Sequence, residues 1–247
     1  MMERNLRVLS YNIHKGFALT QNFVLEAIRE NIRRVGADIV FLQEVQAQNT
    51  RHQKRINGWP EDQLEYLADS IWPHFAYGKN AIYDAGHHGN AILSKYPIVG
   101  SENIDISNNR FERRGILHAV VDTQAGPAHL LNVHLDLTAG GRRNQCDRIV
   151  QRIESAIPNR ERLILAGDFN DWRGLISNNF ETRLGLIEAF LKTKGTHAKT
   201  FPSIYPMLTL DRIYLRGYQP IEALTHAGSP WSRLSDHLAI ETKIQPE

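Results

Sequence analysis

Short apolar runs of strand length recur along the whole chain, and stretches of helical periodicity separate several of them. In residues 23–35 the apolar side chains recur at helical spacing, which predicts an amphipathic helix. Residues 46–60 are polar and contain glycine and proline, which is typical of a loop. Strands are predicted at residues 6–13, 38–45, 90–94, 115–122, 128–134, 163–166, 210–215, 221–225 and 237–244, with further helices around residues 64–71 and 142–156. Two packed sheets flanked by helices suit this order.

The organisation of the chain predicts one domain over residues 1–247, because there is no internal repeat, low-complexity tract or linker. No apolar run approaches the roughly 20 residues that a membrane-spanning helix needs. The charged residues 1–7 lead directly into a strand and do not form a secretory signal. Cys146 is the only cysteine, which excludes an internal disulfide and a thiolate zinc cluster. We therefore expect a cytoplasmic protein, and a monomer.

Polar or acidic residues stand at the ends of several apolar runs or at the start of the following loop. A single Asn or Asp there is most often a turn former. Repeated placements of this kind in one chain weaken that interpretation, and carboxylates beside buried strands are costly unless they are paired or bind a metal. The placements are Asn12, Glu44, His134, Asp168 with Asn170, Asp211, and Asp236 with His237.

These residue types fit one chemistry. Carboxylate and amide oxygens are hard ligands that suit Mg²⁺ or Mn²⁺ far better than zinc. Two histidines beside them, His134 and His237, suit binding and protonating a phosphate. The sequence lacks a Walker A loop, a G-x-S-x-G elbow, a G-x-G-x-x-G turn and an H-E-x-x-H helix, which are the signatures of competing chemistries.

With these residues in view, the chain resembles the endonuclease/exonuclease/phosphatase superfamily, whose members have a DNase I-like fold. The resemblance implies an α/β four-layer α-β-β-α sandwich, with two mostly antiparallel sheets flanked by helices. Residues 77–81, 87–91 and 167–173 are similar to compact, uncharacterised bacterial members of the superfamily. The matching motifs occur in the family's order at residues 11–13, 42–44, 89–97, 132–135, 167–170, 210–213 and 235–237.

The resemblance also implies roles for the site residues. Glu44 is expected to be the principal Mg²⁺ ligand, with Asn12 and Asp236 close by and Mn²⁺ as a substitute ion. Asp168 is expected to orient and deprotonate the attacking water, and Asn170 to fix Asp168 and contact the phosphate.

Three further residues are expected to act on the phosphate group. The resemblance implies that His237 binds a non-bridging phosphate oxygen, that Asp211 orients its ring, and that His134 assists the leaving group. Such a site cleaves a phosphate ester by in-line attack of water, where the protein supplies mainly positioning and charge stabilisation.

Other residues near these motifs have two interpretations each. Arg114, with Arg113, is expected either to clamp a phosphate or to be an ordinary solvated charge. His88, with His87, either faces the cleft and binds substrate or is merely exposed. Trp231 either lines the substrate entrance or anchors the core.

The sequence does not decide between nucleic acid and phospholipid as the class of substrate. The net charge of +2 is compatible with an anionic partner but does not demand one. The basic segment 50–57 suits a nucleic acid backbone or is a solvated loop, which leaves a nuclease in contention. The apolar segment 201–207 suits a phospholipid headgroup and peripheral membrane contact, and buried packing explains it equally well. A non-catalytic binding module is the third hypothesis, although every expected catalytic position is filled.

Overall fold

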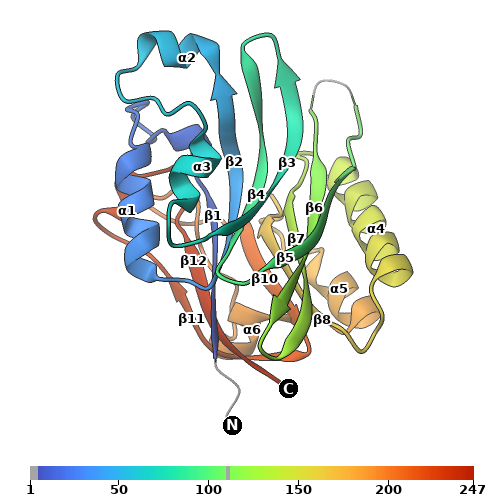
Figure 1. Ribbon diagram of the computed structural model, residues 1–247. Helices are drawn as coiled ribbons and strands as arrows, with labels where there is room; N and C mark the ends of the chain where they lie inside the picture. Colours follow the sequence, from blue (N-terminus) through green and yellow to red (C-terminus); the bar gives the residue numbers. More distant parts are fainter. Residues whose placement is uncertain (1–4, 110–111) are drawn as a thin grey trace.

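The computed structural model describes residues 5–109 and 112–247. Two six-stranded sheets pack face to face, and helices cover the outer face of each sheet (Figure 1). This arrangement confirms the predicted four-layer α-β-β-α sandwich. None of the helices within the described ranges is both long and apolar enough to cross a bilayer.

The first sheet has the strand order β11-β12-β1-β2-β4-β3. Only β1 and β2 in this sheet run parallel, and the other neighbouring pairs are antiparallel. The strands are β1 (Leu6–Asn12), β2 (Ile39–Asn49), β3 (His74–Tyr83), β4 (Gly86–Ser94), β11 (Tyr218–Thr225) and β12 (Ile240–Pro246).

The second sheet has the order β5-β6-β7-β8-β10-β9. Here β7 and β8 form the parallel pair, and the other pairs are antiparallel. The strands are β5 (Ile98–Asp105), β6 (Gly115–Thr123), β7 (Gly126–His134), β8 (Arg162–Asp168), β9 (Ile187–Glu188) and β10 (Asp211–Arg216).

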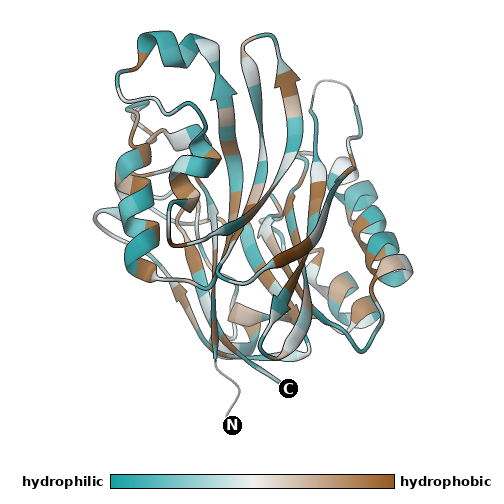
Figure 2. Cartoon of the chain, in the orientation of Figure 1, coloured by the Kyte–Doolittle hydropathy of each residue, from teal (hydrophilic) through white to brown (hydrophobic). Residues whose placement is uncertain are grey.

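Helices α1 (Leu25–Val35) and α3 (Gln63–Ala68) cover the first sheet, while α4 (Ala139–Ala156) and α5 (Ser177–Leu184) cover the second. One face of α1 is buried at helical spacing, and the helix ends at Gly36, whose φ of 66° is left-handed. Its outward face, like that of α2 (Thr50–Arg55), is mostly hydrophilic (Figure 2). The remaining short helices are α6 (Ala189–Lys194), η1 (His14–Gly16) and η2 (Trp231–Arg233).

Three apolar layers hold the four layers of structure together. Val8 of β1 packs between the sheets, whereas its neighbour Leu9 packs under the helices on the outer face. Successive side chains of a strand point to opposite faces, and both faces of the central strands are covered, so apolar side chains occur on both faces. On the second sheet, Leu165 packs in the same way beneath Ile149 of α4.

Two predictions of local structure were wrong. Residues 46–60 are not a loop throughout: β2 continues through bulges to Asn49, and α2 follows. The Asn49 side chain caps α2 by accepting hydrogen bonds from the backbone N–H groups of Arg51 and His52, at 3.1 and 3.0 Å. The last strand begins at Ile240 rather than at residue 237, which leaves His237 outside the sheet.

Candidate active site

The ends of four strands bring the predicted polar residues together. In the second sheet, Asp168 lies opposite His134 of the parallel strand β7 and opposite Asp211 of the antiparallel strand β10. Asn12, at the end of β1 in the other sheet, donates a hydrogen bond from Nδ2 to Asp168 Oδ2 at 3.1 Å. Two sheets thus contribute to one buried cluster.

A charged triad forms the centre of this cluster. His237 Nδ1 lies 2.9 Å from Asp211 Oδ2, and its Nε2 lies 3.6 Å from Asp168 Oδ2. Burial opposes the charged ring, but Asp211 and then Asp168 outweigh it and raise the pKa of His237. Thr200 donates its hydroxyl to the same oxygen of Asp211, which fixes that carboxylate. The triad therefore holds an imidazolium at neutral pH.

Asp168 is the most completely engaged carboxylate of the site. Its Oδ1 accepts the backbone N–H of Asn170 at 2.9 Å, and its Oδ2 lies 3.4 Å from His134 Nε2. Asn170 has a left-handed φ of 50° and donates from Nδ2 to the carbonyl of Leu135 at 2.9 Å. Burial raises the pKa of Asp168 above its ordinary value, although the charge on His237 opposes this. A carboxylate held in this way is suited to accept a proton near neutral pH.

Glu44 has the opposite electrostatic character. It has a left-handed φ of 57°, and its Oε2 lies 3.2 Å from Lys15 Nζ. Burial acts to raise the pKa of Glu44, but electrostatic interactions with the neighbouring His134, Lys15 and His14 outweigh it and lower the pKa to about 2. Glu44 is therefore ionised at neutral pH. Sequence reasoning missed Lys15, whose only signal was its place just after the residue 11–13 motif.

The donor set around Glu44 fits a hard divalent cation. Glu44 Oε2 is buried and accepts no well-directed hydrogen bond within residues 5–109 and 112–247. Asp236 is half-buried, with Oδ1 3.9 Å from His14 Nδ1. The Asn12 amide oxygen accepts the His14 backbone N–H at 3.1 Å and, as an sp² oxygen, retains a second lone pair. Oxygen ligands that include an ionised carboxylate suit Mg²⁺ or Mn²⁺.

A tighter group of potential ligands lies beside this set. Ligand atoms of Asp168, Asp211 and His237 all lie within 4.8 Å of one another. This group differs from the set expected from the sequence. The ion pairs of His237 with both carboxylates account for its compactness. The metal site expected at Glu44, Asn12 and Asp236 stays a prediction.

Electrostatic interactions link two further predicted residues, His88 and Arg114, to the cluster. Burial, with the charge on Arg114, lowers the pKa of His134 well below its ordinary value, so His134 is a neutral ring. Burial followed by the charge on Lys15 lowers the pKa of His88 to about 4. Arg114 Nη2 lies 2.6 Å from Glu112 Oε1, while its buried Nε has no partner in the described part of the chain. The structure thus places both His88 and Arg114 near the cluster.

An apolar loop stands at the edge of the site. The Phe201 ring packs 5.1 Å from that of His237, and Ser203 Oγ donates to the Ser235 carbonyl at 2.7 Å. The next side chains are not buried, since Ile204, Tyr205 and Met207 are 64%, 72% and 57% exposed. The buried-packing interpretation is therefore wrong for these three residues.

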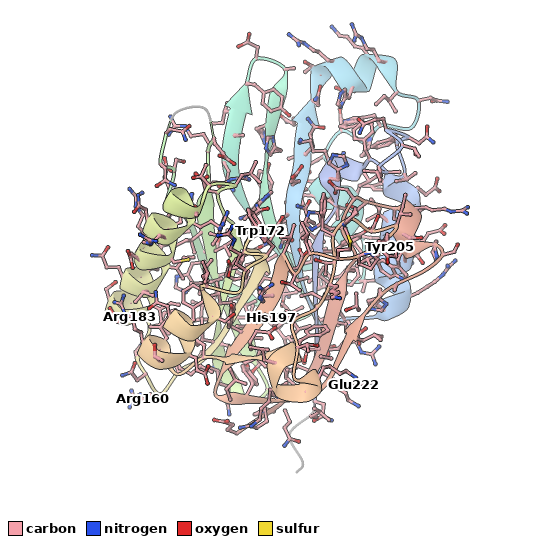
Figure 3. The ribbon with its side chains drawn as sticks, turned by 180° about the vertical axis from the view of Figure 1, so that it is seen from behind. Arg160, Trp172, Arg183, His197, Tyr205 and Glu222 are labelled. Atoms are coloured by element: carbon pink, nitrogen blue, oxygen red, sulfur yellow. The ribbon has the colours of Figure 1, made fainter. Side chains whose placement is uncertain are left out.

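Two tryptophans near the site differ in environment. Figure 3 shows Trp172, on the segment after β8, at about the same height as Tyr205, and Trp172 is exposed. Trp231 instead anchors the core, because it is 8% exposed and packs edge-on to Tyr11 at 5.6 Å. Its alternative role at the substrate entrance finds no support.

Comparison with known proteins agrees with this geometry. The uncharacterized protein YbhP of Escherichia coli strain K12 is 40% identical over 244 residues, which span 97% of this chain and 96% of YbhP. An endonuclease/exonuclease/phosphatase from Beutenbergia cavernae has a similar structure, with a TM-score of 0.80 at 20% identity, covering 98% of this chain and 72% of that one.

A mannosyl-6-phosphatase from Bacteroides thetaiotaomicron shares the fold, with a TM-score of 0.71 at 17% identity over 97% of this chain and 99% of that one. D. rerio TDP2 complexed with a single strand DNA product does so with a TM-score of 0.74 at 19% identity, over 98% and 100% of the two chains. The model of the Endonuclease/Exonuclease/phosphatase family matches residues 9–237. The chain therefore belongs to the endonuclease/exonuclease/phosphatase family, and it is a hydrolase of phosphate esters.

Proposed function

We propose that the protein is a divalent-metal-dependent phosphodiesterase that acts by in-line attack of an activated water. The observation that carries this proposal is the environment of Asp168. Its carboxylate is buried, fixed by Asn12 and Asn170, and flanked by the rings of His134 and His237. A base held between a charged and a neutral imidazole is suited to deprotonate water beside a phosphate.

The protein's own groups take the proton of the attacking water and stabilise the departing oxygen, which leaves with the P–O bonding pair and gains its proton from bulk water. Asp168 takes the proton of the attacking water, while the His237 imidazolium binds a non-bridging phosphate oxygen and Asp211 orients its ring. His134, as a neutral ring, donates a hydrogen bond to the departing oxygen. Fixed donors aimed at developing charge are the largest contribution in such reactions.

Glu44, Asn12 and Asp236 would hold Mg²⁺, or Mn²⁺ in its place, and the bound ion supplies positive charge that neutralises the phosphoryl oxygens. Lys15 holds the Glu44 carboxylate ionised without an ion. Asn170, Arg114 and His88 line the approach to Asp168 and contact the substrate phosphate in this proposal.

The proposal is tested by hydrolysis of bis(p-nitrophenyl) phosphate, nicked plasmid and anionic phospholipid vesicles, each with Mg²⁺, Mn²⁺ or EDTA. We expect turnover of the chromogenic diester with either ion and none with EDTA. Turnover that survives EDTA would contradict the metal dependence. Inertness toward all three substrates would favour a binding module.

The exposed apolar loop favours a phosphodiester presented at a lipid surface over a nucleic acid. Each large apolar side chain that leaves water contributes about 1.5 to 3 kcal/mol, so Ile204, Tyr205 and Met207 together suit insertion into a headgroup layer. The basic side chains of α2 are the competing feature, since Arg51, Lys54 and Arg55 are exposed.

A double variant separates these two candidates. Replacing Ile204 and Met207 by Ser should leave hydrolysis of the soluble diester unchanged and weaken binding to anionic vesicles about tenfold or more. Sedimentation with vesicles measures the binding, and Leu224→Ser, at an exposed position of β11, is the matched control. Unchanged vesicle binding, with plasmid as the preferred substrate, would favour the nuclease.

A further inference from the structure

A polar groove opens where the edge strands of the two sheets meet. It has a volume of about 370 Å³. Its lining includes Lys79 and Asn80 of β3, Asn103 and Asp105 of β5, and Arg113 and Arg114, which precede β6. The groove lies outside the buried triad of Asp168, His237 and Asp211.

The groove carries an excess of positive charge. Lys79, Arg113 and Arg114 line it, whereas Asp105 is the one carboxylate in the lining and Glu112 pairs with Arg114. The Asp105 carboxylate is already engaged by Arg113 Nη1 at 3.2 Å and by the backbone N–H of Ser107 at 2.8 Å. Lys79 is exposed and forms no ion pair with any residue that the structure describes. The groove therefore attracts anions.

Hydrogen-bond donors in the groove lack acceptors. The buried Nε of Arg114 has no hydrogen-bond partner among the described residues. Asn80 Oδ1 accepts a hydrogen bond from Asn103 Nδ2 at 3.1 Å, so the Asn80 amide presents its Nδ2 donor, which no acceptor in the described ranges satisfies. Unsatisfied donors beside excess cations match a phosphate group, which carries several acceptor oxygens.

Arg114 joins the groove to the catalytic cluster. It lines the groove, and its charge acts on both His134 and His88. Its backbone is fixed by Ser107, whose Oγ accepts the Arg114 N–H at 3.0 Å. Arg114 thus belongs to the lining of the groove and also acts electrostatically on two histidines of the catalytic cluster.

We propose that this groove binds a second phosphate group of the substrate, adjacent to the phosphodiester that is cleaved. The inference rests on the proposed phosphodiesterase function for the position of the first phosphate. A second phosphate occurs in an oligonucleotide and in a phosphorylated lipid headgroup. Recognition by Lys79, Arg113 and Arg114 is common to both sources.

Binding without turnover tests the groove separately from the reaction. Calorimetry in EDTA compares dithymidine phosphate with its 5′- and 3′-phosphorylated forms, and glycerophosphoinositol with its 4-phosphate. We expect the added phosphate to tighten binding about tenfold in at least one of these series. A gain in affinity in only one series identifies the second phosphate as that of a nucleotide or of a lipid headgroup. Equal or undetectable binding of all the ligands would contradict the proposal that the groove binds a phosphate.

Variants locate the added affinity. In Lys79→Gln the gain from the second phosphate should fall about threefold, with the affinity for the singly phosphorylated ligand unchanged. Arg113→Gln should act in the same direction, and Lys192→Gln, an exposed cation on α6, is the matched control. A gain that persists in both groove variants would overturn the assignment. If the wild type binds the second phosphate more tightly but does not hydrolyse the diester, the groove assignment stands and the proposed function is contradicted.

Discussion

Two carboxylates of the site are held in opposite electrostatic environments. Glu44 is ionised well below neutral pH, because the cations around it outweigh the effect of burial, whereas burial raises the pKa of Asp168. Pairs of carboxylates whose pKa values are driven apart by their surroundings commonly take different roles in catalysis. A permanently charged Glu44 suits a metal ligand, and a more basic Asp168 suits a proton acceptor.

Glu44→Gln tests the first of these roles. Removing the charge should weaken Mn²⁺ binding by about tenfold or more, because the carboxylate is the principal hard ligand of the set. Calorimetric titration with Mn²⁺ measures this without substrate. Glu61→Gln, at an exposed position, is the control, and equal affinities in the two variants would remove Glu44 from the metal site.

Elements that carry the catalytic motifs were predictable, and edge elements were not. Strands such as β1 and β8 are largely buried, mainly apolar and end in a polar residue. In contrast, β5 lies at a sheet edge and is almost wholly exposed, so it lacks the apolar periodicity that marks a strand. Helix α2 was missed because it buries none of its side chains.

A buried histidine pair links three elements far from the catalytic motifs. His118 of β6 and His129 of β7 join through Nε2 and Nδ1 at 2.9 Å. Arg152 of α4 donates to His118 Nδ1, and Glu161 accepts from His129 Nε2. Because Arg152 is only a donor, this chain of bonds requires both rings to be neutral.

The pair should make stability depend on pH. Burial, followed by the electrostatic effect of the neighbouring His129, lowers the pKa of His118 to about 4. Below about pH 6.5 the unfolded chain binds a proton that the folded protein excludes, so stability is lost as the pH falls from 6.5 toward 4. Glu102, which also faces the ring at 3.9 Å, moderates this effect.

We expect this histidine to account for about 1 to 2 kcal/mol of the stability lost between pH 7 and pH 5. Urea unfolding of the wild type and of His118→Gln at both pH values measures the contribution. The variant should show the smaller pH dependence. Equal dependence in the two proteins would mean that His118 is not the titrating group.

Across the whole molecule, buried amides fasten the two sheets together beneath the site. Gln43 of β2 donates from Nε2 to Asn132 Oδ1 of β7 at 2.8 Å. Asn132 Nδ2 returns to the first sheet by donating to the carbonyls of Leu42 and Ala91, at 2.9 and 2.8 Å. Gln43 adjoins Glu44, so these bonds set the position of Glu44 relative to the second sheet.

Asn132→Ala should therefore destabilise the fold by about 3 kcal/mol, since it leaves the Gln43 amide and two carbonyls unpaired in the core. Urea unfolding measures the change, with Asn57→Ala at an exposed position as the control. A loss no larger than that of the control would show that the sheets do not depend on this amide.

The sequence motifs predict the principal residues of the site but not the contacts that support them. Motif order identified residues from Asn12 to His237, and the structure brings them together. Their supporting contacts were not predictable, because Thr200 carries no local signal and the place of Lys15 after the residue 11–13 motif does not show that it pairs with Glu44.

The central claim is that Asp168 is the base of a metal-dependent phosphodiesterase. Its most direct test is hydrolysis of bis(p-nitrophenyl) phosphate with saturating Mg²⁺ by the wild type and by Asp168→Asn, with circular dichroism as the check on folding. We expect the wild type to turn over the diester and the folded variant to be slower by about 10³-fold. A folded variant that retains a rate within about tenfold of the wild type would contradict the account.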